Sequence, residues 1–171
     1  MNKQKVLGII VLIIGILLIY VFFNRFDKPD FTSEENQVKL YFSTKDAMYL
    51  DIEKREVDGA NLYINTINEL IKGPQSSQLN QTIPEGTEVL DIEVKDRIVR
   101  VSFNRALIEN HWGGSTGETM TVYSIVNTLV QFNEIDKVLL LIEGKKIDTL
   151  AGHLFLEEPL TVNKDIIKNE K

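Results

Sequence analysis

The sequence predicts an α+β domain, a two-layer sandwich with two helices packed on one face of a single sheet, preceded by one transmembrane helix. Three observations support this prediction. A long apolar run near the N-terminus carries no charge, five later segments have strand patterns, and two segments have the periodicity of amphipathic helices. The predicted order in the domain is ββ-α-ββ-α-β, with an antiparallel or mixed sheet.

The apolar run, residues 6–23, predicts a membrane-spanning helix. About eighteen residues at about 1.5 Å each give roughly 27 Å, which just spans the hydrocarbon core of a bilayer. Residues 1–5 form a short basic N-terminus, which also fits the alternative of a cleavable secretory signal. The run is longer than the apolar core of most signals, and no small-x-small cleavage site follows it. We therefore expect an uncleaved signal anchor in the cell membrane.

Charge around the run says little about orientation. Lys3 and Lys5 precede it and Arg25 and Lys28 follow it, so the positive-inside rule gives only a small bias. A free amino terminus adds one positive charge to the short side. We expect a single-pass protein with a cytoplasmic N-terminus and an extracytoplasmic C-terminal domain.

The remainder of the chain divides into a linker, one domain and a tail. Residues 24–36 mix charges, Pro29 and small polar residues, which is typical of a linker. Residues 37–162 have the size of one domain, and the charged tail, residues 163–171, is expected to fray. The first 30 residues carry four basic and two acidic side chains, so of the net charge of −6 the remainder carries −8. Nucleic acid is therefore not an expected partner, because phosphate binding needs a basic face.

The domain begins with two strand-like segments, residues 38–44 and 48–53. In both, apolar and polar residues alternate, which predicts half-buried strands. The apolar positions are Val38, Leu40, Phe42, Met48, Leu50 and Ile52. The short turn between the segments predicts a hairpin.

Residues 61–72 change to helical periodicity. The apolar stripe consists of Tyr63, Ile64, Ile67, Leu70 and Ile71. Gly73 and Pro74 stop the helix, because glycine accepts a left-handed conformation and proline cannot continue the hydrogen-bond ladder. Pro84 and Gly86 then mark a turn, and residues 89–94 and 98–103 alternate around a polar turn as a second hairpin.

Residues 111–118 form a glycine-rich loop that ends in a helix start. Gly113 and Gly114 precede Ser115, whose side chain can cap the helix while Glu118 reaches back to the Ser115 amide, as in a capping box. We expect this helix to end near Asn133, with one apolar and one polar face. The apolar face holds Val122, Tyr123, Val126, Leu129 and Val130, and the polar face holds Ser124, Asn127, Thr128 and Gln131. Residues 137–142 then predict a buried central strand, which ends in a turn at Gly144.

Six of these features, in this order, resemble the GerMN domain, also called the sporulation and spore germination domain. They are residues 70–74, 83–87, 102–104, 113–115, 124–129 and 142–145. The resemblance covers roughly residues 38–162. It implies a non-catalytic domain, displayed outside the cytoplasmic membrane, with a fold related to the ring-building motifs of secretion and sporulation channels.

The resemblance also implies assembly, because such modules pack side by side in membrane-anchored rings or envelope scaffolds. This chain has one copy of the domain, and it has a predicted transmembrane helix where many relatives have a lipidated cysteine. It contains no cysteine. The expected partners are the membrane, through residues 6–23, and either an envelope protein or a second copy of the chain.

No constellation in the sequence favours an enzyme. The two histidines, His111 and His153, are far apart and lie in no metal-binding motif, so neither metal nor cofactor is expected. The glycine-rich loop lacks the lysine of a phosphate-binding loop. Asp91 and Glu93 could share one strand face, as glycoside hydrolysis needs, but they are more simply the solvent face of a hairpin.

Trp112, the only tryptophan, lies beside His111 on the glycine-rich loop. Its side chain either packs in the core or contacts a partner protein. In the second case, His111 is expected to take part in the same contact. The sequence thus favours an interaction module of the cell envelope, linked to sporulation or spore germination, without a small-molecule substrate. The alternative is a domain that binds or hydrolyses a cell-wall polymer, with Trp112 stacking on sugar.

Overall fold

A computed structural model describes residues 37–168 of the chain. The predicted N-terminus, transmembrane helix and linker, residues 1–36, lie outside the described residues. Within residues 37–168, every helix is too short or too polar to span a bilayer. The unit Asn36–Lys171 has a hydrophobic core of its own, drawn from residues 38–156. This fragment is therefore suited to experiments on the domain alone.

The strands of the described residues form two sheets, so the prediction of a single sheet is wrong. In the first sheet the order is β2-β1-β3, and in the second it is β4-β5-β6-β7. The strands are β1 (Gln37–Thr44), β2 (Leu50–Glu56), β3 (Leu79–Asn80), β4 (Val89–Lys95), β5 (Ile98–Phe103), β6 (Lys137–Ile142) and β7 (Lys145–Lys146). Both predicted hairpins are present, and β5 and β6 pair in parallel, which makes the second sheet mixed as predicted.

Within residues 37–168, three helices accompany the sheets: α2 (Leu62–Ile71), α3 (Ala106–Glu109) and α4 (Ser115–Leu129). Helix α2 agrees with the predicted helix, and its chain turns at Gly73 with a φ of 81°. The one-turn helix α3 has too few residues to show a periodicity and was not predicted. Met48, predicted to face the core, is 61% exposed because β2 begins only at Leu50.

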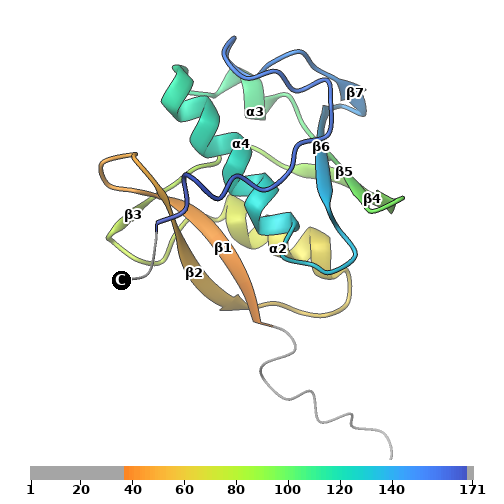
Figure 1. Ribbon diagram of the computed structural model, residues 1–171, viewed down its shortest axis with the longest axis horizontal. Coiled ribbons are helices and arrows are strands. Elements are labelled where there is room, and N and C mark those ends of the chain that lie inside the picture. Colours follow the sequence, from red (N-terminus) through yellow and green to blue (C-terminus); the bar gives the residue numbers. More distant parts are fainter. Residues whose placement is uncertain (1–36, 169–171) are drawn as a thin grey trace, which may run out of the picture. The chain divides into compact units, whose positions relative to one another are not determined.

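Helix α4 separates the two sheets and explains why they do not merge (Figure 1). On the side of β1 opposite β2, only Ser43 and Thr44 pair with β3, and the edge before them meets polar side chains from the C-terminal end of this helix. The backbone N–H of Tyr41 donates to Thr128 Oγ1 at 3.2 Å, and that of Lys39 donates to Gln131 Oε1 at 2.8 Å. These bonds replace the strand that a continuous sheet would need at this edge.

The predicted polar face of α4 is therefore not solvent-exposed, and the helix ends at Leu129 rather than near Asn133. Ser124, Asn127 and Thr128 are fully or almost fully buried. Each has a hydrogen-bond partner, so burial leaves their polar groups satisfied. Periodicity alone could not distinguish polar residues that face water from polar residues that face a strand edge.

The same bonds fix the direction of α4 against β1. Its C-terminal end lies beside the beginning of β1, while Ser115 and Thr116 at its N-terminal end line a hollow with Met48, beyond the end of β1. The 15 residues of α4 span about 22 Å. The chain enters the domain at Gln37, so the N-terminal end of α4 lies at the opposite pole (Figure 1). We call it the distal pole.

The C-terminal segment docks on the domain instead of fraying, as far as Lys168. Asn163 exchanges two hydrogen bonds with the Asn127 side chain, and Ile167 forms a parallel bridge with Leu50 at the edge of β2. Ile166 and Ile167 pack beside Leu50. Burial of this apolar pair, within an otherwise charged tail, stabilises the docked position.

Candidate interaction site

The loop between α3 and α4 carries His111 and Trp112 and lies at the distal pole. Gly114 is the N-cap residue of α4, with φ 78° and ψ 151°, and it makes no side-chain cap. Ser115 is the first helical residue, so the predicted capping box between Ser115 and Glu118 is wrong. The backbone N–H of Glu118 donates instead to the carbonyl of Gly114 at 3.0 Å.

The side chain of Glu118 does not cap the helix. It is fully buried and binds a second loop, residues 150–153. One carboxylate oxygen accepts the backbone N–H groups of Leu150 at 2.8 Å and Ala151 at 3.0 Å. The other accepts the N–H of His153 at 2.8 Å. Burial alone would raise the pKa of Glu118, but the three N–H donors outweigh burial and hold this pKa below its ordinary value. The charged carboxylate therefore ties residues 150–153 to α4.

His111 is held by both nitrogens of its ring. Nδ1 accepts the backbone N–H of Gly113 at 2.9 Å, which leaves the proton of the neutral ring on Nε2. Nε2 lies 3.1 Å from Thr121 Oγ1, and that hydroxyl donates to the carbonyl of Thr82 at 2.7 Å. With both nitrogens used inside the domain, His111 positions its neighbour rather than offering a hydrogen bond to a partner.

Trp112 is 54% exposed, so the interpretation of a core tryptophan is wrong. Its indole ring stacks on the His111 ring, with centroids 5.3 Å apart and planes 21° apart. The pyrrole edge lies against Gly117, where a side chain's Cβ would approach Cδ1 and Nε1 of the indole to 2.9 Å. Two supports thus fix a large aromatic ring on the surface, which lowers the entropy lost when a ligand covers it.

An open hollow of about 760 Å³ adjoins Trp112. Its other lining residues are Gln81, Glu85, Gly86 and Asn110. The amides of Gln81 and Asn110 donate to the carbonyls of Ile83 at 2.7 Å and Glu85 at 2.8 Å. These bonds orient each amide and leave its oxygen as an acceptor.

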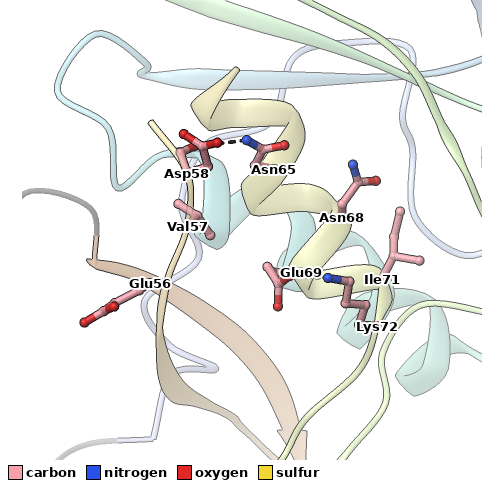
Figure 2. Close-up of a pocket in the computed structure, with 8 residues that line it drawn as sticks. All are labelled: Glu56, Val57, Asp58, Asn65, Asn68, Glu69, Ile71 and Lys72. Carbon is pink, nitrogen blue, oxygen red and sulfur yellow. Dashed lines mark hydrogen bonds and ion pairs between the residues drawn. The ribbon is translucent and has the colours of Figure 1, made fainter. Parts of the chain in front are cut away.

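A second hollow runs along α2 at the end of β2 (Figure 2). Several of its polar groups have partners in the fold: the Asn65 amide donates to the carbonyl of Asp58, and Glu69 pairs with Lys72 and with Arg55. The contact between Arg55 and Glu69 joins β2 to α2. The hollow beside Trp112 differs in having a fixed, exposed aromatic ring, so it is the better candidate site.

The other residues considered from the sequence lie elsewhere. Asp91 and Glu93 are exposed on β4 and do not line the hollow beside Trp112. His153 is an exposed loop residue. In the part of the chain that the structure describes, no group of three metal-ligating side chains comes together.

Several supporting residues were not found from the sequence. Thr82, Thr121, Gln81 and Asn110 reach the site through contacts between distant segments, which local patterns do not reveal. Gly117 did offer a signal, because a glycine in the first turn of a helix is unfavourable and often marks a close approach. Here the approaching group is the indole ring.

Acidification is expected to loosen the Trp112 loop through His111. Burial lowers the pKa of His111 below 6.5 against the opposing charge of Glu118, and a proton on Nδ1 would displace the Gly113 N–H. Because the unfolded state binds this proton more tightly, stability falls as the pH drops from 6.5 through the folded pKa. Trp112 fluorescence between pH 8 and pH 5 should show the transition. The variant His111→Phe, which keeps an aromatic ring but cannot titrate, should lack it; an unchanged midpoint would contradict this assignment.

The two-sheet fold and the loop before α4 define a class of small α+β domain, and comparison with known proteins places the chain in it. The family model described as sporulation and spore germination (Germane) matches residues 39–148. The chain belongs to this family, whose domain is also called GerMN. No curated protein matches the chain.

Solved structures agree with this assignment. A crystal structure of a candidate lipoprotein from Clostridium perfringens is 30% identical, with a TM-score of 0.56, over 75% of this chain and 87% of that one. The first GerMN domain of the sporulation protein GerM from Bacillus subtilis is 20% identical, with a TM-score of 0.60, over 75% and 98%. The tandem GerMN domains of GerM give 20% identity and a TM-score of 0.63 over 73% of this chain, which spans 45% of that one.

Proposed function

We propose that the chain is a non-catalytic, membrane-anchored interaction module of the cell envelope that acts in sporulation or spore germination. Its domain lies outside the cytoplasmic membrane and contacts a second envelope protein or a second copy of the chain. Membership of the sporulation and spore germination family supports the setting. The uncharged run at residues 6–23 supports the anchor, which replaces a lipid in a chain without cysteine.

One observation carries the proposal: the distal pole exposes apolar side chains, and one of them, Trp112, is held in place by the fold. Trp112 is 54% and Met48 is 61% exposed, and the N-terminal end of α4 lies between them. A rigid exposed tryptophan is the type of residue that contributes most to protein interfaces. The chain enters the domain at Gln37, near the other end of α4, so a partner at this pole does not contact the point of entry.

The alternative of a hydrolase loses support from the same geometry. The two carboxylates considered for acid-base catalysis, Asp91 and Glu93, are exposed on β4, apart from the hollow beside Trp112. An acid and a base must flank the bond that they cleave. The hollow could still bind a polymer without cleaving it.

Crosslinking in cells tests the proposal. A photo-crosslinking amino acid in place of Thr116, which is exposed at the distal pole, should give a crosslinked species at high yield. The same amino acid in place of Asp91, exposed on β4, is the matched control and should give little. A product of twice the chain mass would identify self-association. Absence of any product from Thr116, with the protein present in the membrane, would refute the proposal, as would equal yields from both positions.

A further inference from the structure

We propose that the hollow beside Trp112 binds a linear glycan of N-acetylated hexoses, the chemistry of a cell-wall strand. This binding shares Trp112 with the protein contact proposed above, but its other residues differ. It uses the side of Trp112 that faces Gln81, Glu85 and Asn110, and it does not need the surface around Met48.

The aromatic ring supplies the first element of such a site. A hexose ring presents polarised C–H groups on one face, and the negatively charged face of an indole attracts them. Trp112 is fixed for this purpose by His111 behind it and Gly117 at its edge. A sugar that stacks on it therefore does not have to order the ring first.

The polar lining supplies the second element, because it is rich in hydrogen-bond acceptors. The amide nitrogens of Gln81 and Asn110 each give one of their two N–H groups to a backbone carbonyl, which fixes where the amide oxygens lie. Among residues 37–168, the remaining amide oxygens and the Glu85 carboxylate take no hydrogen bond from the protein. A ligand rich in O–H and N–H donors, such as an N-acetylated sugar, matches these acceptors.

The shape of the hollow favours a chain of sugars over a single basic side chain. At about 760 Å³ it is within the range of about 300–1,000 Å³ for ligand sites, much larger than one arginine side chain, and it is open. It contains only one carboxylate, whereas its other acceptors are neutral amides. An open, mostly neutral hollow can hold consecutive rings of a strand that passes across the surface.

The test uses fluorescence, because Trp112 is the only tryptophan of the chain and reports on this site alone. The fragment from Asn36 is titrated with triacetylchitotriose. We expect a saturable change in emission. Gly117→Ala should weaken binding by about tenfold or more, since its Cβ displaces the indole ring, while the helix itself gains stability from alanine. Met48→Ala, on the other side of α4, should bind within about twofold of the unchanged protein.

Further variants and a second ligand complete the design. Glu85→Ala, at an exposed position, should weaken binding by about three- to tenfold. Trp112→Ala, measured by calorimetry, should abolish binding. No saturable response of the folded fragment at the solubility limit of the trisaccharide would overturn the proposal. So would retained affinity in Trp112→Ala, or a salt-sensitive response to arginine ethyl ester alone, which would show a cation site instead. These titrations test only the glycan site. The crosslinking experiment at Thr116 tests the proposed function separately, so either proposal can fail without the other.

Discussion

Replacing Arg55 with methionine is expected to lower the free energy of unfolding by about 3–5 kcal/mol. Arg55 is only 7% exposed, and its guanidinium joins three parts of the domain. It donates to Glu53 Oε1 from Nε at 2.9 Å, to the Glu69 carbonyl at 3.0 Å and to the Gly73 carbonyl at 2.6 Å. Its charge also lies 5.6 Å from the centre of the Phe42 ring. Methionine fills similar space but removes one shared donor from two carboxylates and two carbonyls, and it removes the positive charge between Glu53 and Glu69.

Urea denaturation of the fragment from Asn36, followed by circular dichroism, measures this loss. Arg105→Met is the matched control, because Arg105 pairs with Glu109 at the surface, where both side chains are more than half exposed. The control should change stability by less than about 1 kcal/mol. Equal effects of the two substitutions would show that the Arg55 network does not hold β2 to α2.

Removing the Glu118 carboxylate is also expected to cause a large loss of stability. Glu118→Ala should destabilise the domain by about 3–5 kcal/mol, because three backbone N–H groups lose their acceptor inside the fold. Glu118→Gln keeps one oxygen but turns an NH₂ group toward an N–H donor, so a loss of about 1–3 kcal/mol is expected. The exposed substitution Glu109→Gln is the control and should be nearly neutral.

The pH dependence distinguishes the charge of Glu118 from its packing. Its folded pKa lies below the ordinary value of 4.5, so its contribution is complete above that value and is lost as the pH falls through the folded pKa. Glu118→Gln cannot titrate and should lose less stability than the unchanged fragment between pH 6 and pH 3. If the variant and the unchanged fragment lose the same amount of stability over this pH range, carboxylates other than Glu118 account for the acid sensitivity.

Local patterns in the sequence were sufficient for most elements of the domain. Alternation located both hairpins, helical spacing located α2 and α4, and the apolar run from Lys137 located β6. These signals depend on which side of one element is buried, which neighbouring residues encode. The one-turn helix α3 and the two-residue strands are too short for such a signal.

The errors concern contacts between distant residues. The division into two sheets depends on Thr128 and Gln131 bonding to β1, 87 and 92 residues away. Glu118 fits a capping box by its spacing from Ser115, yet it binds a loop more than 30 residues later. The exposure of Trp112 likewise follows from His111 and Gly117 holding it outside the core. No periodicity encodes these pairings.

The bonding of β1 to α4 has a consequence for the order of folding. Strand β1 is the first of the described strands to be made, but the part of its edge that β3 does not pair is completed only by residues 128 and 131. At about 5–20 residues per second, synthesis of the intervening chain takes on the order of 5–20 s. Contacts of such long sequence separation also slow the folding reaction itself. A nascent chain thus carries, for seconds, a partly apolar hairpin with one incompletely paired edge.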